Sequence, residues 1–121
     1  MILTLILFTL ANIVLAFVDA RKIVKGNVIN HVINAAVYVA MIAVPYFLFH
    51  NYWLIGALLF NRLLVFNIAL SLFRGLKWDY ISPSPASVTD KLAKSVFGNN
   101  GKLMYGVYAA AFTVLTIIAF L

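Results

Sequence analysis

Arg62 lies inside an apolar run, residues 52–73, together with Asn61 and Asn67. The run is long enough to cross a bilayer as a helix. A charged side chain at the centre of such a helix costs about 2.5–3.5 kcal/mol on insertion scales, so it normally faces protein or water and has a partner. A guanidinium also offers a planar fork of N–H donors that matches carboxylate or phosphate. Arg62 is therefore either a costly structural fastener or part of a site for an anion.

Other polar side chains reach the same depth from neighbouring runs. Arg62 is about ten residues from the start of its run at residue 52, and Asn12 is about ten residues from the start of the first run at residue 2. Both starts are expected on the same side of the membrane, so both side chains lie about 15 Å deep. Asp19 follows seven residues after Asn12 and is the expected counter-charge for Arg62. We predict a polar cluster, or a path for a ligand or ion, made of Arg62, Asp19, His31, Asn34, Asn12 and Asn67, with Asn30 beside it.

Three non-enzymatic hypotheses fit this cluster. Its side chains can simply hold helices together, at about 0.6–2 kcal/mol for each hydrogen bond. They can bind an anion such as a lipid headgroup, with Arg62 and the basic approach at Lys25 and Gly26 as donors. In several copies, they can line an anion-selective pore or transporter. In size and charge the chain also resembles a phage holin, which would imply a pore.

An enzyme is the least favoured class, although the sequence leaves it open. The chain has three acidic residues, two histidines and no cysteine. His31 and Asp19 form a conceivable base and orienter, but no metalloprotease motif or carboxylate pair accompanies them. The two histidines stand at opposite ends of one run, nearly 30 Å apart as a helix, and cannot share a metal ion in one chain. We expect no catalytic residue, no metal and no cofactor.

The composition decides the class of protein. Hydrophobic residues make up 65% of the chain and charged residues 10%, against about 25% charged residues in soluble domains. The mean hydropathy is +1.06. The net charge of +6 comes from basic residues scattered between apolar runs, a pattern that does not favour nucleic acid. Anionic lipid headgroups are the expected partner.

Four apolar runs predict an all-α integral membrane protein, a bundle forming a single membrane domain over residues 1–121. The expected transmembrane helices are residues 2–18, 30–49, 52–73 and 103–121. The first run is a candidate signal peptide, but basic residues follow it instead of preceding it, which favours a retained helix. The link at 50–51 is so short that the second and third helices must form an antiparallel hairpin.

The connection over residues 75–102 contains a further predicted helix. Residues 81–85 hold two prolines and should be extended, whereas Ser87 is suited to cap a helix over 88–97. That helix is amphipathic, so it either lies in the headgroup plane as an interfacial helix or packs on the rest of the protein. Basic residues expected at the membrane surface are Arg21, Lys22, Lys25, Arg74, Lys77, Lys91 and Lys94.

The basic residues also predict the orientation. Eight of the nine Lys and Arg residues lie in the first and third expected links, residues 19–27 and 74–102. A four-helix topology puts these two links on the same side of the membrane. The positive-inside rule makes that side cytoplasmic and both termini external, in a plasma or inner membrane.

Ala36 and Ala40 on the second helix, and Gly106 and Ala110 on the fourth, are small residues suited to helix packing. The favoured function is a self-associating subunit or scaffold of a membrane complex.

Overall fold

The computed structural model describes residues 1–27, 30–81 and 88–121, and every regular element among them is helical. The elements are α1 (Ile2–Val24), α2 (His31–Phe49), α3 (Tyr52–Asn61), a π-helical turn η1 (Arg62–Phe66), α4 (Asn67–Phe73), α5 (Val88–Phe97) and α6 (Gly101–Phe120). The elements α3, η1 and α4 form one continuous helix over Tyr52–Phe73. This long helix, α1, α2 and α6 are four helices that are long and apolar enough to span a membrane, which confirms the predicted all-helical fold with four long apolar helices and suggests a membrane location.

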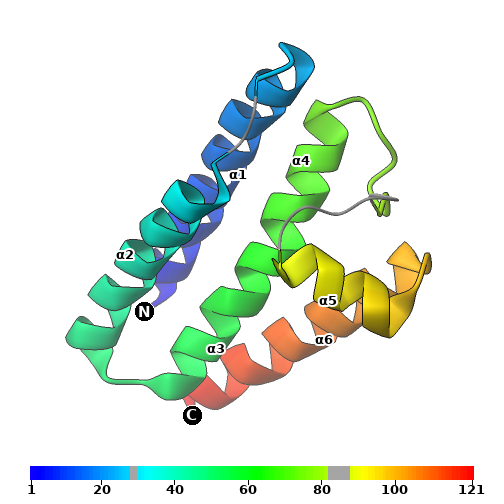
Figure 1. Ribbon diagram of the computed structural model, residues 1–121. Helices are drawn as coiled ribbons and strands as arrows, with labels where there is room; N and C mark the ends of the chain where they lie inside the picture. The colour runs from blue at the N-terminus through cyan, green and yellow to red at the C-terminus, as the bar shows by residue number, and fades with distance from the viewer. Residues whose placement is uncertain (28–29, 82–87) are drawn as a thin grey trace.

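The long central helix organises the bundle. Its first part, α3, packs mainly against α6, and its last part, α4, packs mainly against α1 (Figure 1). Both termini and the link at 50–51 lie at one end of the bundle, while the first link and the end of α4 lie at the other (Figure 1). Asn51 secures the first of these ends because its side-chain amide donates to the carbonyl oxygen of Ala119 at 2.9 Å.

The first helix is longer than the sequence predicted. It continues to Val24 instead of ending near residue 18. Asp19 and Ala20 in the added turns are buried, and just before them the Phe17 ring meets the Phe73 ring of the central helix edge-on, with the centroids 5.4 Å apart. Packing of this kind outweighs the polarity of the segment, which had indicated a loop over 19–27.

Asparagine is the N-cap residue of three of the other helices. Asn30 accepts hydrogen bonds from two backbone N–H groups in the first turn of α2, and Asn51 and Asn100 each accept one at the starts of α3 and α6. An N-cap asparagine satisfies N–H groups that have no partner within the helix. The second helix therefore begins just after the predicted start at 30, and the fourth begins at 101, two residues before the predicted 103.

The short helix α5 has the bounds that the sequence predicted. The extended segment expected over 81–85 falls largely outside the described residues, as does the expected cap Ser87. Ala93 and Phe97 of α5 pack against the buried cluster of α6 tyrosines, whereas Leu92 and Val96 are 62% and 73% exposed. One face of α5 therefore rests on protein, and another side is left free to meet a membrane surface.

Most of the apolar side chains point outward. One core cluster centres on Phe8, Leu54 and Leu58, and a second centres on Tyr105 and Tyr108 of α6. By contrast, Pro45 is the only buried residue of α2. So large an exposed apolar surface is typical of a protein face that meets lipid or another protein.

Gly101 allows the start of α6 to approach the backbone of the preceding loop. An added Cβ at this position would lie 1.9 Å from the carbonyl oxygen of Asp79, far inside van der Waals contact. Gly106, one and a half turns later in the same helix, has no atom within 4 Å of its added Cβ. The two glycines therefore form a matched pair for a test of this packing.

We predict that Gly101→Ala lowers the free energy of unfolding by about 1–3 kcal/mol, because the methyl group must displace backbone. Gly106→Ala should leave the free energy of unfolding unchanged or slightly raised, because alanine favours a helix and its methyl group would contact no other atom at this position. Unfolding in mixed detergent micelles measures both variants. Equal stability of the two would contradict the close approach at Asp79.

Candidate functional site

A chain of buried hydrogen bonds joins α1, α2 and α3 in the middle of the bundle. The Tyr38 hydroxyl donates to Asn12 Oδ1 at 2.7 Å, and Asn12 Nδ2 donates to Asn61 Oδ1 at 2.9 Å. Asn61 Nδ2 donates to Thr9 Oγ1 at 2.9 Å, and the Thr9 hydroxyl ends the chain on the Leu5 carbonyl oxygen at 2.8 Å. Both asparagines are almost completely buried. The bond between the two asparagines is therefore fully buried, whereas the bonds that involve Tyr38 and Thr9 are partly buried.

Arg62 lies beside this chain but bonds to other groups. Its Cζ is 3.8 Å from the ring centroid of Phe66 and 4.6 Å from that of Tyr38. Its Nη1 donates to Asn67 Oδ1 at 3.3 Å. Two aromatic faces and one amide oxygen thus surround the guanidinium, and contacts of this kind stabilise a desolvated cation. The charge is held mainly by cation–π contacts, which the sequence reasoning did not consider.

The π-helical turn η1 explains why Arg62 reaches Asn67. Residues five positions apart in an α-helix point about 140° away from each other, because each residue advances by about 100°. A π-helix has more residues in each turn and brings positions i and i+5 close to the same side. The wider turn over Arg62–Phe66 therefore allows the hydrogen bond between two side chains that a regular helix would separate.

Asp19 is not the direct partner of Arg62 that we expected. Its Oδ2 accepts from Asn34 Nδ2 at 3.0 Å, whereas Arg62 donates to Asn67. Asp19 lies on the face of α1 where the first turns of α2 pass, so the amide of Asn34 is the nearer donor. The carboxylate still lies near enough to attract the guanidinium through space, as does that of Asp90.

A small cavity adjoins this pair. It has a volume of about 10 Å³ and is lined by Asp19, Asn34 and Tyr38 among others. That volume is close to the least space that one water molecule needs. The polar residues on α1 and α2 therefore adjoin room for a single small molecule.

The remaining predicted residues lie apart from this interior. His31 is exposed at the first position of α2, where Asn30 acts as the cap. The predicted surface cations are exposed except for Arg74 and Lys94, which are half-buried. In the described parts of the chain, no three His, Cys, Asp or Glu side chains gather as a metal site would require. The structure thus brings Asn12, Asp19, Asn34, Arg62 and Asn67 into one region and leaves His31 outside it.

Sequence reasoning missed Asn61, Thr9 and Tyr38 as members of the buried chain. A signal for Asn61 was present, because it sits one residue before Arg62 and hence at the depth of Asn12. Nothing comparable pointed to Tyr38, since a tyrosine in the middle of an apolar run is usually part of the packing. Its role depends on which way α2 is rotated.

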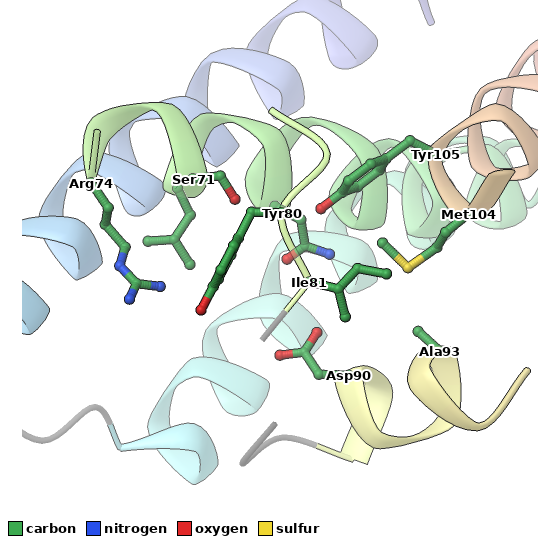
Figure 2. Close-up of a pocket in the computed structure, with 10 residues that line it drawn as sticks. Ser71, Arg74, Tyr80, Ile81, Asp90, Ala93, Met104 and Tyr105 are labelled. Carbon is green, nitrogen blue, oxygen red and sulfur yellow. The ribbon is translucent and has the colours of Figure 1, made fainter. Parts of the chain in front are cut away.

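A larger pocket lies at the end of α4, between the loop that follows it, α5 and the start of α6 (Figure 2). Its volume is about 80 Å³. The lining residues are Asn67, Leu70, Ser71, Arg74, Tyr80, Ile81, Asp90, Ala93, Met104 and Tyr105. Asn67 belongs both to this wall and to the contact with Arg62. The pocket was not predictable from the sequence, because its walls come from four separate segments.

Comparison with known proteins adds no family. No protein-family model, no curated protein and no solved structure matches this chain. The functional argument therefore rests on the residues and their geometry.

We predict that Asn12→Leu and Asn61→Leu each lower the free energy of unfolding by about 1 kcal/mol, because each leaves the other asparagine without its partner. The double variant should cost less than the sum of the two, since no unpaired amide of this pair then remains. Unfolding in mixed micelles gives all three values, and Asn99→Leu in the exposed turn before α6 is the control. Strict additivity would contradict the bond.

Proposed function

We propose that this protein is an integral membrane protein of four transmembrane helices that acts, without catalysis, as a self-associating subunit or scaffold of a membrane complex. Both termini face outward and the basic links face the cytoplasm. The proposal draws on the four apolar helices, on the interior polar groups that bond to each other, and on the small residues left on the outer surface of α6.

The outer face of α6 is the observation that carries self-association. Gly106 and Ala110 are both exposed, and an added Cβ on Gly106 would meet nothing. Small residues four positions apart let a second helix approach closely, which is how helices associate in lipid without a hydrophobic driving force. Within the chain, α6 packs through its other side on α3. The small-residue face is therefore available for another copy.

The interior favours a structural role over a conduit or an enzyme. Tyr38, Asn12 and Asn61 are hydrogen-bonded to one another, and the rings of Tyr38 and Phe66 contact the Arg62 guanidinium. A pore would need such groups to face a continuous water path. A base would need an acceptor atom free to take a proton, and the side-chain oxygens of Asn12, Asn61 and Thr9 already accept hydrogen bonds. Fastening three helices accounts for each of these contacts.

The arrangement of the links supports the orientation. Both termini and the link at 50–51 lie at one end of the bundle, and the end of α1, which carries Arg21 and Lys22, and the end of α4, which precedes Arg74, lie at the other (Figure 1). Lys and Arg in short links are retained on the cytoplasmic side. Arg21, Lys22 and Lys77 are exposed there and suit contact with anionic headgroups.

We predict that Gly106→Leu weakens self-association by at least about tenfold while the single copy keeps its fold, because leucine separates the two helices at their closest approach. Crosslinking in the membrane and native mass in mild detergent measure the effect. Ala35→Leu, which adds similar bulk at an exposed position of α2, is the matched control. A wild-type protein that stays a single copy in both measurements would overturn the proposal.

Arg62→Gln separates the scaffold from a conduit. If Arg62 is a fastener, the variant should lose about 1 kcal/mol of stability, since the cation–π contacts with Tyr38 and Phe66 disappear. Ion flux in liposomes should be no different between this variant and the wild type. A change in flux or in anion preference at unchanged stability would favour the pore instead.

A further inference from the structure

We propose that the pocket between α4, α5 and α6 binds the headgroup of an amine-bearing phospholipid, with its phosphate at Arg74 and its ammonium at Asp90. The inference rests on the membrane placement proposed above but not on self-association. It rests on where the pocket lies, how large it is, and how its charged side chains are arranged (Figure 2).

The pocket lies at the depth of a headgroup. Ser71 and Arg74 come from the last turn of α4 and the residue after it, and Met104 and Tyr105 come from the first turns of α6. These are the positions at which two membrane-spanning helices meet the aqueous border. Trp78, which is 44% exposed in the adjoining loop, is of the type that settles at that border.

The pocket is large enough for more than solvent. Its volume of about 80 Å³ is several times the roughly 10–15 Å³ that one water molecule requires. Leu70, Ile81, Ala93 and Met104 form an apolar part of the wall, while the other lining residues are polar or charged. A ligand with one apolar and one charged portion matches such a lining better than a simple ion does.

The phosphate end is the side formed by α4. The guanidinium of Arg74 lies with its Cζ 5.9 Å from the ring centroid of Tyr80, and it is half-buried. Figure 2 shows its side chain extending along one side of Tyr80. Arginine binds phosphate oxygens through its planar fork, more specifically than a lysine does. The buried Ser71 supplies a hydroxyl on the same wall.

The ammonium end is formed by α5 and two aromatic side chains. The carboxylate of Asp90 points into the pocket from α5, and Tyr80 stands between it and Arg74 (Figure 2). Tyr105 reaches the same space from α6. A carboxylate beside tyrosine rings suits an organic cation, which gains both an ion pair and cation–π attraction. Asp90 also has contacts within the chain, so the ammonium would join an existing group of interactions.

The opposite charges of Arg74 and Asp90 select the ligand class. A lone phosphate would have to approach the carboxylate of Asp90, and a lone amine would have to approach the guanidinium of Arg74. A phosphate linked to an ammonium by a short chain places each charge beside its opposite. The headgroup of phosphatidylethanolamine and free phosphoethanolamine share this chemistry, and the position of the pocket favours the lipid.

The test uses the full-length protein in detergent micelles with added phosphatidylethanolamine or phosphatidylglycerol, and bound lipid is counted by native mass spectrometry. Wild type should bind phosphatidylethanolamine more tightly than phosphatidylglycerol. Arg74→Gln should weaken binding of both lipids about tenfold, because a charge-assisted bond to phosphate is lost. Asp90→Asn should weaken binding of phosphatidylethanolamine alone.

Two exposed cations provide matched controls. Lys77→Gln removes a positive charge from the loop that carries Tyr80, and Lys91→Gln removes one from α5 next to Asp90. Neither should change the preference between the lipids. An equal loss in Lys77→Gln and Arg74→Gln would mean general surface attraction and would overturn the site, as would an unchanged lipid preference in Asp90→Asn.

A further arm identifies the source of the ligand. Free phosphoethanolamine that displaces the lipid only at high excess supports the lipid as ligand, and displacement at equal concentration supports the soluble compound in the same pocket. Should Arg74→Gln fail to fold, Arg74→Lys keeps the charge without the fork and should weaken binding less. Wild-type binding of phosphatidylglycerol as tight as that of phosphatidylethanolamine overturns the proposal whatever the variants do.

Discussion

The hydrogen bond between Asn12 and Asn61 is the constraint on which the rest of the bundle depends. It joins the first helix to the central helix where neither amide can reach water. A buried amide without a partner costs free energy, so the two helices can pair in only one rotation and one depth. With that pairing fixed, Tyr38 brings α2 to the same point, and three helices are set by one group of side chains.

The surroundings of Arg62 are partly set by this group of hydrogen-bonded side chains. Tyr38 both donates to Asn12 and presents its ring to the guanidinium, so the chain of hydrogen bonds also positions one face of the cation's surroundings. Phe66 and Asn67 supply the rest from within the same helix. A charge in an apolar helix is accommodated here largely by rings and an amide that are themselves neutral, and the carboxylates act from a distance.

Features that depend on one stretch of chain were predictable from the sequence. The number of long helices followed from run length and hydropathy, and the bounds of α5 followed from its flanking signals. The rotation of each helix about its axis did not follow, because it depends on partners far away in the sequence. Asp19 was therefore matched with Arg62 on depth alone, when Asn34 was the nearer group. The π-helical turn and the pocket beside α5 were missed for the same reason.

The π-helical turn has a consequence for the faces of the central helix. It works like one extra residue inserted into a regular helix, and it turns every position after it by about 100° relative to those before. The first part, α3, can thus direct its packing side to α6 while the last part, α4, directs its own to α1. Removing a single residue between 62 and 66 would therefore act as a twist and not as a shortening, and one of the two partners would lose its matching surface.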